Sequence, residues 1–549
     1  PKLKKKLYIL SGSTIGEIAD QIELFCLRFG IKLEIKYGDY ARFFEEAVFD
    51  SENIKAFQPD YIYIHTSNKN IQNWPKPCES KEQVDVKADL DFKRYKMVLD
   101  SLLNIFSCPI IQNNFELLPY RILGNKDLLE PSGKNHYIDL LNHKLYDYVQ
   151  NKDGVYINDI NYLSAYMGIQ NWYDPDFWYR YKYALSLDAI PYLAHNLSLI
   201  IKSLCGLNHK VLALDLDNTL WGGVVGDDGV DALHIGSETA LGEAFSDFQT
   251  YLDDLKKLGI VLTVVSKNEE DIAKKAFSRK EMILSLEDFP EFKANWEAKS
   301  SNIKEIAKNL NLGLDSFVFV DDNPAERQEV KMNAPVVAVP EISQPEQYIF
   351  DLDSQGYFEI TNFTADDTKR TDYYKQNKLR EEEQANYTDY NDYLNSLQMK
   401  WEFTDFDPAA IERITQLINK TNQFNLTTAR MGLNEVKEKM LADDYLCLQG
   451  TMEDKFGDNG IVTLLIGKIV ENTLQIDLWV MSCREFKRNG EYKLFDYLVT
   501  RCKEKGISQI RGTYIPTAKN AIVKDFYETL GFRLTKTNEN NSTEWEKNL

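Results

Sequence analysis

The chain has 549 residues, with 64 Lys and Arg against 85 Asp and Glu, which gives a formal net charge of −21. At about 150 residues per domain this length predicts three or four domains, and the acidic balance disfavours binding to a phosphate backbone. No apolar stretch approaches the roughly 20 residues needed to span a bilayer. The seven cysteines include no Cys-x-x-Cys pair, which favours reduced thiols. We therefore expect a cytoplasmic protein with neither a membrane nor a nucleic acid as its partner.

The first segment, residues 1–205, alternates apolar strands with helical patterns, which predicts a parallel sheet. Its first strand, Leu7–Leu10, is followed by Ser11-Gly12-Ser13 and then by an amphipathic helix. This order resembles the nucleophile turn of SGNH-type esterases, with Ser13 at the nucleophile position. Such enzymes also need an Asp-x-x-His, but here Asp176 is followed by Tyr179, and His195 lies inside an apolar helix. We expect an SGNH-like α/β domain that binds a partner or substrate and does not hydrolyse it.

The second segment, residues 206–345, predicts a doubly wound parallel sheet. Apolar strands are expected at 211–216, 260–265 and 317–320, with amphipathic helices between them. The carboxyl ends of parallel strands meet at one edge of a sheet, where ligands bind. In this segment those strand ends carry side chains capable of chemistry, namely Asp215 and Asp217, then Ser266, then Asp321 and Asp322.

These carboxylates suit phosphoryl transfer. Asp215 at a strand tip can attack phosphorus and form an aspartyl-phosphate. Asp217 can protonate the leaving oxygen and later deprotonate water. Asp322, Asp215 and the carbonyl oxygen of Asp217 offer hard oxygen ligands to Mg²⁺, with Asp321 as a neighbour or an alternative ligand. Solvated acidic turns are the alternative interpretation, but carboxylates crowded at one edge without a cation are costly.

Other polar residues of this segment can hold the phosphate itself. Ser266 and Lys299, at the start of the next expected helix, can bind the phosphoryl oxygens and offset their charge. We expect three further residues to bind phosphate beside them: Asn218, Thr219 and Asn268. The gaps on either side of Ser266 are too short for a cap domain, so the site is either open to a bulky substrate or covered by a neighbouring domain.

Residues 346–398 are charged and rich in Tyr, and with Arg380-Glu381-Glu382-Glu383 they predict a solvated helical linker. The third segment, residues 399–549, predicts an α+β domain with paired strands near 460–470 and 473–481 and a helix after Gly490. No His occurs beyond His234, so chemistry in this segment cannot use a His base or ligand.

Several motifs of the chain occur together in one known group of proteins. They are Val211 to Gly229, Ser266-Lys-Asn268, Asn295-Trp296, Phe319 to Arg327, Lys420 to Thr428, Phe456 to Gly460, Ser482-Cys-Arg484 and Tyr514 to Asn520. Together they resemble the haloacid-dehalogenase superfamily, specifically its FkbH-like branch (subfamily IIIC). The resemblance extends from about residue 200 to the end and more loosely over the first segment.

The resemblance implies an enzyme that requires Mg²⁺ and removes phosphate from a phosphoacyl unit, such as a glyceryl unit from 1,3-bisphosphoglycerate. It also implies that the unit is loaded on an acyl carrier protein or its phosphopantetheine thiol. The alternative is a phosphatase for a small sugar or acyl phosphate, whose flanking domains only bind or cover the substrate. The intact set of strand-end residues argues against a non-catalytic assembly factor.

A basic loop in the third segment resembles the cofactor loop of GNAT acetyltransferases. Arg484, Lys487 and Arg488 precede a helix N-terminus, an arrangement suited to a phosphate. Lys487 and Asn489 replace the glycines of the GNAT loop, so we expect side chains rather than backbone to make the contact. A solvated basic turn is the alternative.

The thiol beside this loop, Cys483, is a candidate acyl carrier because Arg484 and the following helix both favour its thiolate. A small core residue is the alternative. We expect five residues to bind the acyl group or cofactor: Asn422, Cys483, Arg484, Lys487 and Arg488.

Overall fold

The computed structural model describes residues 3–363, 370–384, 386–421, 423–482, 485–486, 488–517 and 520–549. It divides into two units: Pro1–Cys205 with Gly432–Glu438, and Gly206–Met431 with Lys439–Leu549. The first unit contains one sheet and the second contains two. The predicted α/β class, with parallel sheets in the first two segments, is confirmed. Among the described helices, none is both long and apolar enough to cross a bilayer.

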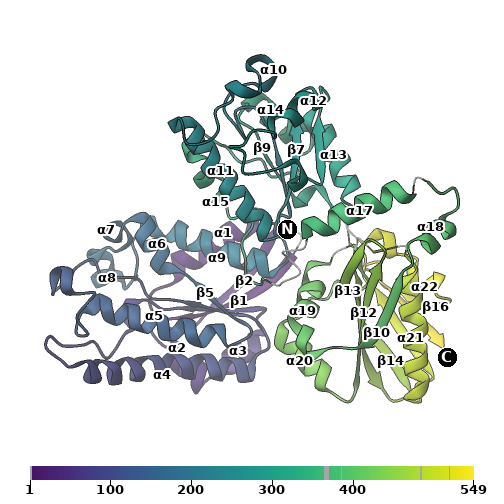
Figure 1. The fold of residues 1–549 in the computed structure, drawn as a ribbon. Coiled ribbons are helices and arrows are strands. Elements are labelled where there is room, and N and C mark those ends of the chain that lie inside the picture. The colour runs from purple at the N-terminus through teal and green to yellow at the C-terminus, as the bar shows by residue number, and fades with distance from the viewer. Residues whose placement is uncertain are drawn as a thin grey trace. The chain divides into compact units, whose positions relative to one another are not determined.

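The N-terminal sheet has five parallel strands in the order β2-β1-β3-β4-β5. Helices cover both faces (Figure 1), so its central strands are continuous apolar runs rather than alternating ones. The face of Tyr8, Leu10 and Ile62 packs against α4 and α5. The strands are β1 (Leu3–Ser11), β2 (Ile31–Tyr37), β3 (Tyr61–His65), β4 (Ile110–Asn113) and β5 (Val155–Asn158).

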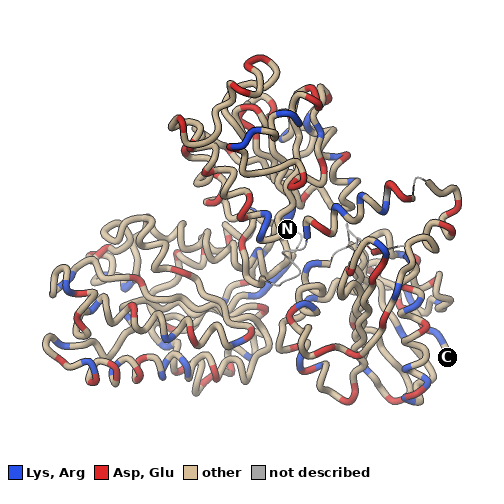
Figure 2. Tube along the Cα trace, viewed as in Figure 1, with Lys and Arg blue, Asp and Glu red and all other residues tan. Residues whose placement is uncertain are grey.

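The longest helix of this unit, α4, has a stabilised N-terminus and one solvated face. The long helix α4 begins with a capping box, in which Ser80 accepts from the Gln83 amide and the Gln83 side chain accepts from the Ser80 amide. Acidic and basic residues are interspersed along it (Figure 2), as expected for a helix with one solvated face. The helices are α1 (Gly16–Arg28), α2 (Phe43–Val48), α3 (Glu52–Phe57), α4 (Lys81–Ile105), α5 (Lys134–Gln150), α6 (Ile160–Met167), α7 (Ile169–Trp172), α8 (Pro175–Tyr181) and α9 (Ile190–Leu204).

The central sheet has four parallel strands in the order β8-β7-β6-β9. Alternate residues of β6 serve two cores: Leu212 and Leu214 pack with α11 and α15, whereas Val211 and Ala213 pack with α13 and α14. The strands are β6 (Val211–Leu214), β7 (Val261–Ser266), β8 (Glu291–Ala294) and β9 (Phe317–Val320); the helices are α10 (Val225–Asp228), α11 (Ala240–Lys257), α12 (Glu270–Ala276), α13 (Lys299–Asn309), α14 (Pro324–Asn333) and α15 (Tyr348–Asp353).

The charged bridge after residue 345 is helical as predicted, but the expectation that it is solvated is wrong at several positions. Tyr348 of α15 is only 2% exposed and belongs to the core of the central sheet. Arg380 of α17 is 1% exposed, because its guanidinium donates to both carboxylate oxygens of Asp454 at 2.6 and 2.8 Å. The described helices of the bridge beyond α15 are α17 (Arg370–Gln384) and α18 (Tyr390–Ser396).

The C-terminal sheet runs β10-β12-β13-β14-β15-β17-β16, and helices lie on both of its faces (Figure 1). Only β14 and β15 pair in parallel within it. The strands are β10 (Lys400–Asp405), β11 (Phe424–Asn425), β12 (Tyr445–Asp454), β13 (Gly457–Val470), β14 (Thr473–Met481), β15 (Gln509–Tyr514), β16 (Arg533–Thr537) and β17 (Thr543–Asn548); the helices are α19 (Ile411–Lys420), α20 (Leu433–Leu441), α21 (Gly490–Glu504) and α22 (Phe526–Thr529).

The two parallel strands of this sheet separate soon after they meet. Pairing of β14 with β15 covers only Thr473, Leu474 and Gln475 on the β14 side. Farther along β14, where β15 no longer pairs with it, the short strand β11 pairs antiparallel with β14. Phe424 lies opposite Met481 and Asn425 opposite Val480. The chain itself therefore occupies this edge of β14.

We expect Arg380→Ala to lower the free energy of unfolding of the second unit by about 3–5 kcal/mol, because it leaves the buried Asp454 carboxylate without its partner. Chemical denaturation followed by tryptophan fluorescence measures the change. Lys455→Ala is the matched control: it breaks the partly exposed pair of Lys455 with Glu383 and should cost less than about 1 kcal/mol. Equal, small losses in both variants would contradict a stabilising role for the buried pair.

Candidate active site

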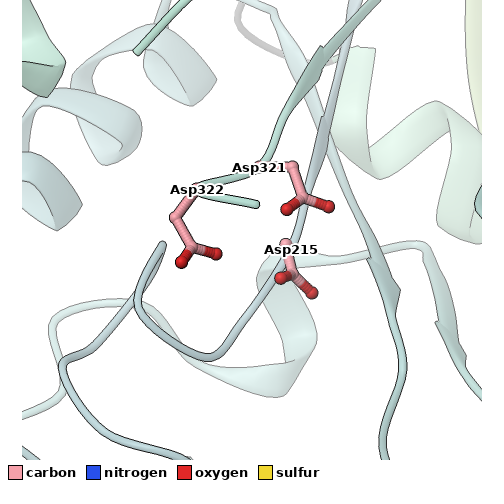
Figure 3. A group of neighbouring side chains, drawn as sticks. All are labelled: Asp215, Asp321 and Asp322. Atoms are coloured by element: carbon pink, nitrogen blue, oxygen red, sulfur yellow. The ribbon is translucent and has the colours of Figure 1, made fainter. Parts of the chain in front are cut away.

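Three carboxylates meet at the carboxyl edge of the central sheet. Asp215 follows β6, and Asp321 and Asp322 follow the neighbouring strand β9, whose Val320 pairs with Leu214. One oxygen from each carboxylate lies within 4.8 Å of the others. Figure 3 shows the three side chains lying close together at these two strand ends. The parallel register therefore brings together residues that are more than 100 positions apart.

The charges at this edge do not balance within the protein. Burial, and then the Asp215 charge, raise the pKa of Asp321 to about 7, and the same two causes raise the pKa of Asp322. Burial opposes the charge on Lys299, but Asp215 and Asp321 outweigh it and raise the pKa of that lysine. One ammonium group thus faces three carboxylates. Their oxygens are the hard ligands that Mg²⁺ prefers, so the residues fit a divalent cation.

Lys299 is the cation nearest the carboxylates. It lies at the first position of α13 and is 2% exposed. Its Nζ is 2.9 Å from an oxygen of Asp215 and also donates to Asp321. The prediction placed Lys299 on the phosphoryl oxygens, and the structure places it beside the proposed nucleophile, from where it can serve both groups.

The loop that carries Asp321 and Asp322 is fixed by groups from three directions. The Asn323 amide donates to Asp321 at 2.9 Å, and the Asp322 amide donates to the Thr219 hydroxyl at 3.1 Å. Arg327, 7% exposed, donates to the carbonyl oxygens of Asp321 and Asp322, at 2.8 Å each. Thr219 is 0% exposed and its hydroxyl positions the Asp322 backbone; its contact with a phosphate stays a prediction.

Asp217 lies outside the carboxylate cluster and is held by three donors. Its Oδ1 accepts from the Trp221 indole at 2.9 Å and from the Val225 amide at 3.1 Å, and its Oδ2 accepts from the Asn268 amide group at 2.9 Å. Asn268 also donates to the Ser266 hydroxyl at 3.2 Å. It therefore links the candidate acid and base to the candidate phosphate ligand.

Asn218 shapes the turn between these residues. Its φ of 55° lies in the left-handed region, which Asn tolerates better than most residues. The side-chain oxygen accepts from the Gly223 amide at 3.0 Å, and its carbonyl oxygen accepts from the Tyr348 hydroxyl at 2.9 Å. Tyr348 thus reaches the site from α15.

Comparisons with known proteins agree with this geometry. A model of the FkbH N-terminal domain matches residues 6–202. The N-terminal part of the protein BF1531 from Bacteroides fragilis, a crystal structure containing a phosphatase domain complexed with Mg, is 32% identical with a TM-score of 0.61. The match covers 66% of this chain and 95% of that one. The chain belongs to the FkbH family.

Other solved structures are less similar. The ribosomal-protein-S18-alanine N-acetyltransferase of Escherichia coli is 11% identical with a TM-score of 0.22, over 27% of this chain and 94% of that one. The PaiA N-acetyltransferase of Thermoplasma acidophilum, in complex with coenzyme A, is 14% identical with a TM-score of 0.21, over 27% and 99%. No curated protein sequence matches. The SGNH-like and GNAT-like assignments of the flanking domains stay predictions.

The serine singled out in the N-terminal domain of this FkbH-family chain is buried. Ser13 is 1% exposed, and no described residue forms a hydrogen bond with its hydroxyl. His65 lies at the end of the adjacent strand, 1% exposed, and its Nε2 likewise has no partner among the described residues. Burial lowers the pKa of His65 to about 4. Ser13 and His65 therefore form no hydrogen-bonded pair among the described residues, and the absence of hydrolysis by this domain stays a prediction.

One residue of the predicted anion loop in the C-terminal domain is ion-paired in the structure. Arg488 is 8% exposed and pairs with the buried Glu485, with a further contact to Asn377 at 3.3 Å. A phosphate would have to compete with Glu485 for it, and its role as a phosphate ligand stays a prediction. The other predicted residues there, Asn422, Cys483, Arg484 and Lys487, lie outside the described residues.

Sequence reasoning assigned no role to Arg327, Trp221 or Tyr348. The only signal for Arg327 is its position at the end of the Phe319 to Arg327 motif. The contacts of all three depend on the turn geometry after β6 and β9, which residue spacing does not specify.

We expect Arg327→Ala to raise by about 10–100-fold the Mg²⁺ concentration that gives half-maximal thermal stabilisation, because Asp321 and Asp322 lose the donor that fixes their backbone. Thermal unfolding across a Mg²⁺ titration measures it. Glu341→Gln is the control, since Glu341 accepts from Arg327 but its side chain is 70% exposed, and it should shift the midpoint by less than about twofold. Unchanged Mg²⁺ dependence in Arg327→Ala would contradict the positioning role.

Proposed function

We propose that this chain is a Mg²⁺-dependent phosphatase that works through an aspartyl-phosphate at Asp215. The observation that carries the proposal is the convergence of Asp215, Asp321 and Asp322 with Lys299 at one sheet edge. The 32% identical structure from Bacteroides fragilis, with its phosphatase domain complexed with Mg, supports it.

The protein groups divide the reaction between them. An Asp215 oxygen bonds to phosphorus as the bond from phosphorus to the substrate oxygen breaks, and Asp217 gives its proton to that oxygen. Asp217 then takes a proton from water, whose oxygen bonds to phosphorus while the bond to Asp215 breaks and phosphate leaves. Lys299 and Ser266 offset the charge on the phosphoryl oxygens. Mg²⁺, held by Asp215, Asp322 and the Asp217 carbonyl, would supply further positive charge against those oxygens.

We expect Asp215→Asn to abolish Mg²⁺-dependent hydrolysis of a generic phosphate ester, leaving less than a few per cent of the activity, because an amide oxygen is a poor nucleophile. Phosphate release with and without Mg²⁺ measures it. Asp227→Asn is the matched control, since Asp227 is exposed in α10 and contributes no ligand to the cluster. Retained hydrolysis in Asp215→Asn would place the nucleophile elsewhere and overturn the proposal.

We further propose that the substrate is a phosphorylated acyl or glyceryl unit, such as one from 1,3-bisphosphoglycerate, and that the unit is loaded on an acyl carrier protein. The resemblance to FkbH-like enzymes supports this, as does the size of the insertions around the site. In the described chain, the insertion between β6 and β7 holds only α10, a short turn and α11. These insertions are too small to form a cap domain, so they leave room for a substrate attached to a long arm.

In the loading step, the phosphopantetheine sulfur forms a bond with the acyl carbon while the bond from that carbon to the phosphate oxygen breaks. The thiol proton leaves with the phosphate. We expect the intact mass of a purified acyl carrier protein to increase by the acyl unit when enzyme, Mg²⁺ and 1,3-bisphosphoglycerate are added. If Cys483 carries the unit first, its sulfur bonds to the acyl carbon as phosphate leaves, and the phosphopantetheine sulfur then displaces the Cys483 sulfur, which takes up the thiol proton. In that case Cys483→Ser should abolish both the mass gain and an acyl adduct on the enzyme. No mass gain with the unaltered enzyme would overturn loading and leave the phosphatase standing.

The second candidate is a phosphatase for a small sugar or acyl phosphate, without transfer. Two observations in the C-terminal domain favour it. Arg488 is paired with the buried Glu485, and β11 already pairs with the edge of β14 that an extended arm would use. Hydrolysis of sugar phosphates by an enzyme that never modifies the carrier would decide for this candidate.

A further inference from the structure

An exposed tryptophan lies beside the candidate active site with no role in the chemistry. Trp296 follows β8 and is 69% exposed, and of the tryptophans in the described chain it is the exposed one. Trp172, Trp221 and Trp479 are at most 2% exposed, and Trp74, Trp401 and Trp545 pack against the cores, where their area stabilises the fold. An indole in solvent gives no such stabilisation.

The loop that carries Trp296 is fixed on the side of Ser266. Its neighbour Asn295 donates from the backbone to the Ser266 carbonyl oxygen at 3.1 Å. The side chains of Asn295 and Asn302 exchange two hydrogen bonds, at 3.2 and 2.8 Å. The Glu297 amide donates to the Asn295 side chain at 3.0 Å. The turn is therefore held firmly between β7 and α13.

The same turn leads directly into the other phosphate-binding residue. Lys299, three positions after Trp296, begins α13 and reaches Asp215 at 2.9 Å. The indole is thus tied through short, hydrogen-bonded backbone to Ser266 on one side and to Lys299 on the other. A phosphoryl group held by those two side chains would therefore lie next to the turn that carries Trp296.

The indole is also oriented. Its Nε1 donates to the carboxylate of the exposed Glu269, just before α12, at 3.3 Å. This contact fixes the polar end of the ring and leaves its faces in solvent. Amphipathic aromatic side chains held in this way act as contact surfaces for ligands, because they offer a large area at little conformational cost.

We infer that Trp296 is a specificity-determining residue that contacts the organic part of the substrate through a planar or apolar face, while Ser266 and Lys299 hold the phosphate. The inference rests on the proposed phosphatase function. It assigns a contact to the organic part of the substrate, which the carboxylates and Lys299 do not bind. It requires that the organic group attached to the phosphate extends over the turn formed by residues 295–298.

Two phosphate donors separate the roles, p-nitrophenyl phosphate with a planar ring and acetyl phosphate with almost no apolar surface. We expect Trp296→Ala to raise KM for p-nitrophenyl phosphate by about tenfold, the loss of one aromatic contact. The value of kcat/KM for acetyl phosphate should stay within about twofold. Trp296→Phe, which keeps an aromatic face, should recover most of the loss, and Glu269→Ala should lie between, because the ring loses its orientation.

The outcomes distinguish this inference from the proposed function. Trp296→Ala with unchanged KM for p-nitrophenyl phosphate would overturn the inference alone. An equal fall in kcat for both donors would also overturn it, because the indole would then only support the structure of the site. Hydrolysis of neither donor by the unaltered enzyme with Mg²⁺ would overturn the phosphatase proposal and the inference with it. Unfolding temperatures of the variants check that each remains folded.

Discussion

Repulsion among three carboxylates is the constraint around which the central domain is built. At the 4.8 Å that bounds their closest oxygens, each ionised pair repels by about 3.5 kcal/mol at an effective dielectric constant of about 20. Three such pairs amount to about 10 kcal/mol, comparable with the whole stability of a typical domain. Lys299 offsets part of this, and burial together with the Asp215 charge raises the pKa of both Asp321 and Asp322. A divalent cation bound by these oxygens would relieve the remaining repulsion.

The surrounding structure keeps the carboxylates from moving apart. Asp215 cannot move away from the other two carboxylates, because the preceding strand β6 lies between β7 and β9 and is buried on both faces. The turn after β9 is tied to Arg327 on one side and to Thr219 on the other. Tyr348 at the start of α15 also supports the site, because its hydroxyl donates to the Asn218 carbonyl oxygen. The supporting groups are buried and mostly uncharged, so they fix geometry without cancelling the charge that would attract a metal.

The parts of this site that the sequence predicts are those fixed by strand register. Asp215 and Asp322 follow apolar runs, and two parallel runs of that kind place their ends at one edge whatever the loops do. Arg327, Trp221 and Tyr348 were not found, because their partners are backbone atoms or a carboxylate in tight turns, and local composition does not specify turn geometry.

Two arginines that look solvated or open to a ligand in the sequence have buried carboxylate partners in the structure. Arg380 looks solvated in a run of charges, yet its partner Asp454 lies 74 positions away. Arg488 looks like a phosphate ligand, although Glu485, three positions earlier, was a visible sign that its charge could be neutralised locally.

The C-terminal sheet shows where the chain limits its own ligands. Where β15 leaves β14, an open edge would offer unpaired amides and carbonyls to any extended chain. Phe424 and Asn425 take those positions, and Asn520, 0% exposed, donates to the carbonyl oxygens of Asn425 and Ile515 and accepts from the Thr517 amide. An extended arm therefore meets backbone that is already paired, and reaches β14 only by displacing a two-residue strand that this asparagine holds.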